Sequence, residues 1–118
     1  MKKVIIFGTG RRMYEYMMRG VFEGFDIVAY CDNDMDKKGK KIDNVSIITP
    51  QELNTIMYDE ILIASDRYYK QMKKQLVEEC GISENTIVKV TTEVNKYEGE
   101  MSFLKAIHMQ EGFHSSFY

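Results

Sequence analysis

Residues 3–18, Lys-Val-Ile-Ile-Phe-Gly-Thr-Gly-Arg-Arg-Met-Tyr-Glu-Tyr-Met-Met, decide the fold of this chain. The apolar first part predicts a short buried strand, and the part from about 11 to 20 predicts a helix. Gly8 allows a tight turn between them, and Gly10 lets a pyrophosphate approach the backbone at the positive end of the helix. Met13 occupies the third glycine position of the G-x-G-x-x-G fingerprint, so the turn alone is a weak indication of phosphate binding.

The composition describes one small globular domain. The chain has 118 residues, of which 44% are hydrophobic and 29% charged, and its net charge of −2 gives no indication of nucleic-acid binding. No apolar run approaches the roughly 20 residues of a membrane helix, and the basic start precedes an apolar run too short for a signal peptide. Cys31 and Cys80 lie far apart outside any C-x-x-C pair, which predicts reduced thiols and a cytoplasmic protein.

Strands and helices are expected to alternate along the chain. Thr49, Pro50 and Glu52 have the pattern of a capping box that opens a short helix, and a polar loop is expected at 36–41. Ser65 and Asp66 are expected to cap a helix that runs to about Cys80, before Gly81. The predicted strands are 3–7, 25–31, 45–48, 60–64 and 86–90.

This alternation predicts an α/β fold with a doubly wound, five-stranded parallel sheet of strand order 3-2-1-4-5. The connections after the first and fourth strands then leave in opposite directions and open a crevice at the carboxyl ends of those strands. The residues expected to contact a ligand at this crevice are Gly8, Thr9, Gly10, Arg11, Asp32, Asn33, Ala64 and Ser65.

Asp32 is the second anchor of the predicted site. It ends the second strand, 24 residues after Gly8, where an acid can accept both hydroxyls of a ribose and would repel a 2′-phosphate. The alternative is that residues 32–34 only form a polar turn. Arg11 and Arg12 open a helix at its positive end, where a bound anion would relieve their charge repulsion. The alternative is two solvated charges that point outward; it stands level with anion binding for Arg11 and is the preferred interpretation for Arg12. One lysine of the run from 37 to 41 could reach a phosphate, but spacing does not select which.

No catalytic or metal-binding set is recognised. Tyr69 and Lys73 have the spacing of the short-chain dehydrogenase pair but come one helix too early, and Tyr69 belongs to an apolar stripe. His108 and His114 lack neighbouring carboxylates or thiols at metal-ligand spacing. No serine or cysteine lies in a nucleophile elbow or beside a paired base.

Over residues 2–90 the chain resembles a Rossmann-like nucleotide-binding module. Such modules form N-terminal domains of bacterial polysaccharide-biosynthesis proteins, which include sugar acyltransferases and sugar- or SAM-dependent transferases; nucleotide-sugar dehydratases and epimerases carry a related domain. The resemblance implies that Asp32 holds the nucleoside and that residues 8–10 meet the diphosphate of a nucleotide-sugar. It rests on the segments 4–10 (VIIFGTG), 27–34 (IVAYCDND), 38–40 (KGK), 48–53 (ITPQEL) and 58–65 (YDEILIAS).

The leading interpretation is therefore a nucleotide- or nucleotide-sugar-binding module (UDP or CDP type) of surface-polysaccharide synthesis that is not catalytic alone and is part of, or partner to, a transferase or dehydratase. The alternative is the NAD(H)-binding domain of an oxidoreductase or sugar-nucleotide dehydratase. Residues 1–92 are expected to form the binding domain and 93–118 a helical tail. Part of that tail resembles the approach to a methyltransferase domain. Its aromatic residues are expected to pack on a second copy or on a separate catalytic chain.

Overall fold

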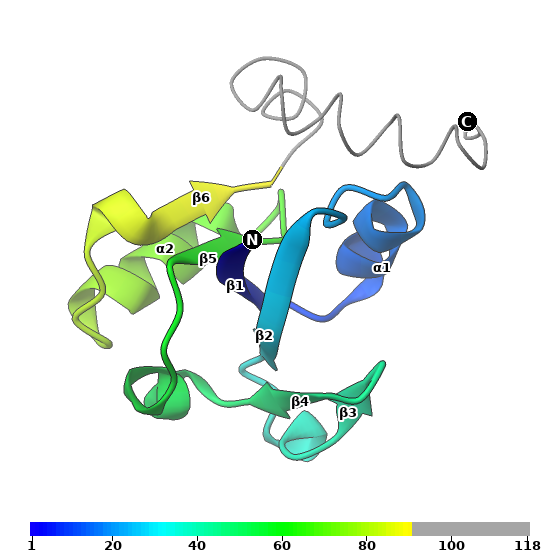
Figure 1. The fold of residues 1–118 in the computed structure, drawn as a ribbon. Helices are drawn as coiled ribbons and strands as arrows, with labels where there is room; N and C mark the ends of the chain where they lie inside the picture. Colours follow the sequence, from blue (N-terminus) through cyan, green and yellow to red (C-terminus); the bar gives the residue numbers. More distant parts are fainter. Residues whose placement is uncertain (91–118) are drawn as a thin grey trace.

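The computed structural model describes residues 1–90, which fold around one twisted sheet (Figure 1). Its six strands lie in the order β3-β4-β2-β1-β5-β6. All neighbouring strands are parallel except β3 and β4, which are antiparallel. The strands are β1 (Lys2–Phe7), β2 (Phe25–Cys31), β3 (Lys41–Ile42), β4 (Val45–Ile48), β5 (Glu60–Ile63) and β6 (Ile87–Lys89).

The predicted α/β class is confirmed, and the five predicted strands lie in the predicted order. These five strands are parallel to one another, as predicted. The prediction missed a sixth strand, because residues 41–42, assigned in part to a loop, form the antiparallel edge strand β3. Asp43 and Asn44 join β3 to β4 with φ values of 49° and 68°. Two successive positive φ values are typical of the tight hairpin turn that reverses a strand, and this turn pairs Ile42 with Val45.

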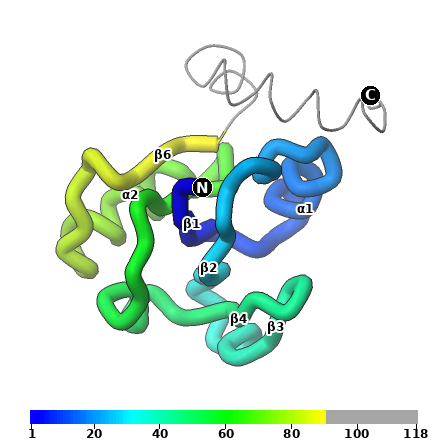
Figure 2. The backbone as a smooth tube through the Cα atoms, viewed as in Figure 1, coloured from blue at the N-terminus to red at the C-terminus, as the bar shows by residue number. Residues whose placement is uncertain are grey.

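Helices cover both faces of the sheet. The helix α1 (Arg11–Met18) buries Met13 and Tyr16 on one face, in a cluster with Val4 and Ile6 of β1. On the other face, the helix α2 (Tyr69–Glu78) packs its buried side on a second cluster that contains Ile5 and Phe7. Figure 1 shows the two helices on opposite sides of β1, and the tube in Figure 2 shows β1 running through the middle of the molecule. Alternate residues of β1 therefore serve two cores.

The helix boundaries differ in part from the predicted ones. The helix α1 ends at Met18, where Gly20, at a φ of 76°, turns the chain away. The segment after Thr49 is a 3-10 helix, η2 (Pro50–Thr55), whose Glu52 carboxylate accepts hydrogen bonds from the N–H and hydroxyl of Thr49. Ser65 and Asp66 do not cap α2, which begins at Tyr69, because Ser65 Oγ closes a separate turn by accepting from the N–H of Tyr68. The 3-10 helices η1 (Met35–Lys37) and η3 (Glu84–Thr86) complete the described part.

Strand register brings the predicted site residues together. Phe7 is paired with Cys31 of β2 on one side and with Ile63 of β5 on the other. The residues that follow these three, Gly8, Asp32 and Ala64, therefore leave the sheet side by side. The predicted helical tail at 93–118, with its aromatic residues, lies outside the described residues. Within residues 1–90, no helix has the length and apolar character needed to cross a membrane.

Candidate functional site

A cleft opens at the carboxyl ends of β1, β2 and β5, where α1 and α2 leave in opposite directions. Its volume is about 940 Å³, which is at the upper end of the usual range for small-molecule sites. All eight residues predicted from the sequence line it: Gly8, Thr9, Gly10, Arg11, Asp32, Asn33, Ala64 and Ser65. Their contact with a ligand remains a prediction.

The glycine turn forms one wall of the cleft. Gly8 has a φ of 104°, and its N–H donates to the carbonyl oxygen of Cys31 at 2.8 Å. A Cβ at Gly8 would lie 3.3 Å from Met72 Cε, whereas a Cβ at Gly10 would have no atom within 4 Å. Within residues 1–90, the backbone N–H groups of Gly10, Arg11 and Arg12 form no hydrogen bond. Three successive N–H groups at the start of a helix, beside open space, are suited to binding an anion.

The Asp32 carboxylate is bonded across the cleft to Thr9. Its Oδ2 accepts hydrogen bonds from the Thr9 N–H at 2.9 Å and from the Thr9 hydroxyl, and its Oδ1 accepts from the Asp34 N–H at 2.9 Å. The bond from the Asp34 N–H closes the polar turn at residues 32–34, which the sequence pattern gives as the alternative role of Asp32. Asp32 thus fastens the end of β2 to the glycine turn and also presents a carboxylate to the cleft.

Lys37 is the lysine of the run from 37 to 41 that lines the cleft. Its Nζ donates to the carbonyl oxygen of Thr9 at 3.3 Å and to Thr9 Oγ1 at 3.2 Å, and lies 3.6 Å from Asp32 Oδ2. The short helix η1, which follows Asp34, carries Lys37 back over the glycine turn. The sequence pattern did not select this lysine, because its position depends on the path of the chain after β2.

The environment of Asp32 favours its charged form. Burial raises the pKa of this carboxyl, but the hydrogen bonds from Thr9 and Asp34, together with the Lys37 ammonium, outweigh burial and hold the pKa below its ordinary value. The folded protein therefore binds protons at Asp32 less readily than the unfolded chain. This contribution to stability is complete above the ordinary carboxyl pKa and is lost as the pH falls through the lowered one.

We expect the difference in unfolding free energy between the wild type and Asp32→Asn to be full at neutral pH and to shrink below about pH 4, the ordinary range of an Asp carboxyl. Urea unfolding of both proteins over a series of pH values measures this difference. The variant Asp36→Asn is the control, since Asp36 lies in η1 next to Lys37 and its carboxylate accepts no hydrogen bond in the described residues. A difference that stays constant into the acid range would contradict the prediction.

The two arginines at the start of α1 already have an acidic partner. Arg11 Nε lies 3.3 Å from one oxygen of Glu15, and Arg12 Nη1 lies 2.9 Å from the other. Glu15 therefore already relieves part of the charge repulsion that a bound anion was expected to relieve. Arg11 remains 92% exposed at the mouth of the cleft, where its guanidinium is open to a ligand. Arg12 also pairs with Asp66 across the cleft, at 3.3 Å from Nε to Oδ2.

Asp66 joins the loop after β5 to α1. Its Oδ1 accepts a hydrogen bond from the hydroxyl of Tyr16 at 3.0 Å, while its Oδ2 pairs with Arg12. Burial and the bond to Asp66 raise the pKa of Tyr16, so the phenol stays neutral. This contact fixes the wall that carries Ala64 and Ser65 relative to the start of α1. Sequence spacing gave no signal for it, because the partners are 50 residues apart.

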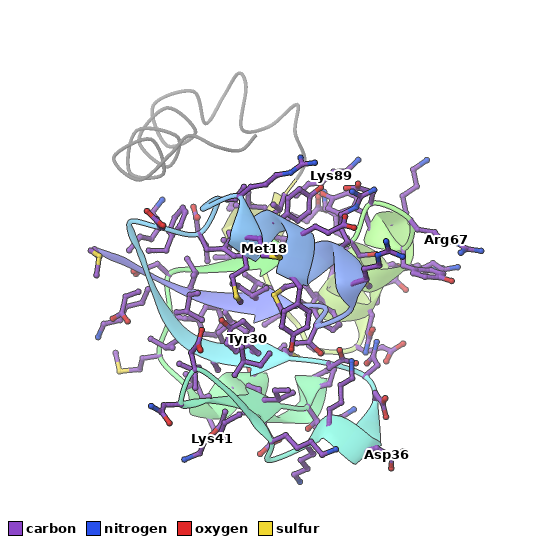
Figure 3. The ribbon with its side chains drawn as sticks, turned by 90° about the vertical axis from the view of Figure 1, so that its right-hand side faces the viewer. Met18, Tyr30, Asp36, Lys41, Arg67 and Lys89 are labelled. Carbon is purple, nitrogen blue, oxygen red and sulfur yellow. The ribbon has the colours of Figure 1, made fainter. Side chains whose placement is uncertain are left out.

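The rim beside α2 contains residues that the sequence did not select. The Arg67 guanidinium stacks over the ring of Tyr68 at 5.3 Å, and Figure 3 shows Arg67 projecting outward from this end of the molecule. Asn33 and Gln75 exchange two amide hydrogen bonds of 3.0 and 2.8 Å, which connect the end of β2 to α2. The sequence does contain one signal for this rim, because Arg67 stands next to the aromatic Tyr68. The sequence pattern places both residues in a helix, whereas they lie in the loop before α2. The cleft residues outside the predicted set are Phe7, Arg12, Asp34, Lys37, Asp66, Arg67, Tyr68, Gln71, Met72 and Gln75.

Metal-binding side chains do not gather in this part of the chain. Within residues 1–90, no three His, Cys, Asp or Glu side chains are placed to hold a metal ion. Cys31 and Cys80 are both free thiols, and burial raises the pKa of each. The polar side chains that line the cleft offer hydrogen bonds and charge to a ligand.

Comparison with solved structures gives Rossmann-like relatives of low sequence identity. UDP-D-quinovosamine 4-dehydrogenase from Vibrio fischeri is 18% identical, with a TM-score of 0.56, and the match covers 84% of this chain and 85% of that one. The Rex-family repressor RSP, in a structure with beta-NADH, is 13% identical with a TM-score of 0.54. That match covers 94% of this chain and 61% of RSP. A further RSP structure, with beta-NAD+ and operator DNA, matches with a TM-score of 0.51 at 13% identity, over 94% of this chain and 58% of that one.

These likenesses establish the fold, in agreement with the sheet order and the two helix layers. No curated protein gives a significant match to the chain. The family model described as C2185-like, N-terminal, matches residues 1–88, which include every strand of the sheet except the last residue of β6 and every residue of the cleft. The chain therefore belongs to the C2185-like N-terminal family.

Proposed function

We propose that this protein binds a nucleoside diphosphate group, as a nucleotide- or nucleotide-sugar-binding module. The observation that carries the proposal is the row of three unbonded N–H groups from Gly10 to Arg12, at the start of a helix and beside open space. The diphosphate lies against this row, because the N–H groups and the helix dipole both favour negative charge there.

The charges that line the cleft support an anionic ligand. Asp32 and Asp66 are each bonded to protein donors, Asp32 to Thr9 and Asp66 to Tyr16. Arg11 is nearly fully exposed, and the structure gives Arg67 no acidic partner within residues 1–90. Arg67 is thus left to attract phosphate oxygens, and Arg11, although it pairs with Glu15, keeps most of its guanidinium open to them.

The two halves of the cleft suit a ligand with two parts. Asp32 lies at the end of β2, where an acid in this fold accepts a ribose hydroxyl. The half beyond the glycine turn has Ser65, the Arg67–Tyr68 stack and Gln71, which offer hydrogen bonds and a flat surface to a sugar or a second nucleoside. The diphosphate then lies between the halves, at Gly8 to Arg12.

The proposed setting is bacterial surface-polysaccharide synthesis, with the module non-catalytic alone and serving a transferase or dehydratase. The likeness of residues 2–90 to modules of such enzymes supports this setting, as does the UDP-sugar in the name of the dehydrogenase with a similar fold. The bonding of both Asp32 and Asp66 to protein donors supports binding over acid–base chemistry. Residues 1–92 would form the binding domain, with 93–118 following as a separate segment.

The second candidate is an NAD(H)-binding domain. The separation of 24 residues between Gly8 and Asp32 favours it, because it is close to the spacing of about 20 in dinucleotide-binding folds. RSP, which has a similar fold, was solved with beta-NAD+ and with beta-NADH. Met13 occupies the third glycine position of the fingerprint and is fully buried against the sheet, where it fills the core of the α1 face.

Isothermal titration of the full chain with UDP-sugars, CDP-sugars and NAD+ tests the proposal. We expect binding of at least one of them, and a loss of affinity of several-fold in Arg11→Gln. The matched control is Lys74→Gln, which removes an exposed cation of α2 that does not line the cleft.

The results separate the candidates. A preference for UDP- or CDP-sugars over NAD+ supports the module, and a preference for NAD+ supports the second candidate. No heat with any of these ligands, or an equal loss in the Arg11 and Lys74 variants, would count against a diphosphate site at the glycine turn.

A further inference from the structure

The acceptor sites of Asp32 are almost all in use. Each carboxylate oxygen has two lone pairs that can accept hydrogen bonds. Oδ2 accepts from the N–H and from the hydroxyl of Thr9, and the Lys37 ammonium lies 3.6 Å away. Oδ1 accepts only from the N–H of Asp34 within the described residues. One acceptor site is thus left on this carboxylate, at Oδ1.

Lys37 fixes the direction of the Thr9 hydroxyl. The ammonium can only donate, so its bond of 3.2 Å to Thr9 Oγ1 uses an acceptor site of the hydroxyl oxygen. The hydroxyl proton is then directed to Asp32 Oδ2. Thr9 is 3% exposed and the Asp32 side chain 15%, so water has little access to replace this bond.

A ribose diol has two hydroxyl protons, and a carboxylate with acceptor sites open on both oxygens can accept both. Here the second proton would have to displace the Thr9 hydroxyl, and the buried hydroxyl would lose its acceptor. Leaving a buried donor unpaired is unfavourable, so the exchange gains little. The geometry favours an acid that accepts one ligand hydroxyl and keeps its bond to Thr9.

We infer that Asp32 accepts a hydrogen bond from a single ribose hydroxyl, at Oδ1. Thr9 is the specificity-determining residue, because its bonds to Oδ2 keep that oxygen from the second hydroxyl. The inference rests on the proposed function and deepens it. The ligand class is a nucleoside diphosphate compound whose ribose needs only one free hydroxyl at this acid. A ribose that lacks the other hydroxyl binds as well as the unmodified one.

The test uses the full chain and ADP, UDP and CDP, each with its 2′-deoxy and 3′-deoxy forms, in isothermal titration. For the wild type, we expect one deoxy form to lose about tenfold in affinity, the effect of one hydrogen bond to a charged group, and the other to bind within about twofold. In Thr9→Ala, which frees the acceptor site of Oδ2 that the hydroxyl occupies while the backbone N–H keeps the other, each deoxy form is expected to lose about tenfold. Thr9→Ser keeps the hydroxyl and is expected to retain the wild-type pattern.

The outcomes distinguish this inference from the proposed function. Loss of affinity for both deoxy forms by the wild type would overturn the single-hydroxyl reading and leave the nucleotide site intact. If neither deoxy form loses affinity, Asp32 contacts no ribose hydroxyl. That result would also overturn the inference and leave the nucleotide site intact. No binding of any nucleotide would overturn the proposed function itself. Thermal unfolding of each variant checks folding, and the wild-type series decides the single-hydroxyl reading even where Thr9→Ala fails to fold.

Discussion

Phe7→Ala is expected to lower the free energy of unfolding by about 3–5 kcal/mol, the usual cost of removing a buried phenylalanine side chain. Phe7 is 1% exposed at the end of the central strand, between Cys31 of β2 and Ile63 of β5. Its side chain belongs to the core cluster that also contains Met72 and Leu76 of α2. The cavity left by alanine would lie directly below the glycine turn, so the site and the core would weaken together.

Urea unfolding followed by circular dichroism measures this loss. Phe7→Leu is the matched control, because leucine keeps most of the apolar volume and is expected to cost much less. The size of the loss relative to a domain stability of about 5–15 kcal/mol means that Phe7→Ala leaves a marginal fold. A loss below about 1 kcal/mol, as for most surface positions, would show that Phe7 is not a core residue.

Gly8→Ala is expected to lower the free energy of unfolding by about 1–3 kcal/mol, the cost of holding a residue with a side chain in a rarely populated backbone conformation. Gly8 has a φ of 104°, which glycine adopts without steric penalty. The added Cβ would also lie 3.3 Å from Met72 Cε and 3.6 Å from the carbonyl oxygen of Ala64. Relief of the strain would move the turn away from β5 and disturb the cleft.

Gly10→Ala provides the internal comparison. Its φ is −90°, in the region open to alanine, and no atom lies within 4 Å of the added Cβ. The free energy of unfolding is therefore expected to stay within about 0.5 kcal/mol of the wild type. Nucleotide affinity is expected to fall, because the methyl group projects where a diphosphate approaches the backbone. Equal destabilisation by both substitutions would refute the distinct roles of the two glycines.

Local sequence patterns were sufficient for the central elements. The apolar runs that became β1, β2 and β5 are buried toward the carboxyl ends of these strands, and such runs predict parallel strands. The glycine turn and the position of Asp32 at a strand end follow from residues that are neighbours in the chain. The strand order followed from the alternation of strands and helices, and it brought the eight predicted residues into one cleft.

The missed features depend on shorter or more ambiguous signals. The strand β3 has only two residues, and its turn consists of Asp43 and Asn44 rather than the more distinctive Asn-Gly. The start of α2 was placed too early, because Ser65 and Asp66 have the side chains of helix caps. In the fold, Ser65 closes its own turn and Asp66 bonds to Tyr16 instead.

The sequence by itself determined the five parallel strands, the glycine turn and the crevice, because hydrophobic period and glycine position act over a few neighbouring residues. Only the tertiary structure decided which side chains meet there: Thr9 with Asp32 across 23 residues, Lys37 with Thr9 across 28, and Tyr16 with Asp66 across 50. These pairs depend on strand register and on the path of the loops, which no local pattern specifies. The same contacts that close the core of the site also leave Asp32 a single free acceptor for a ligand.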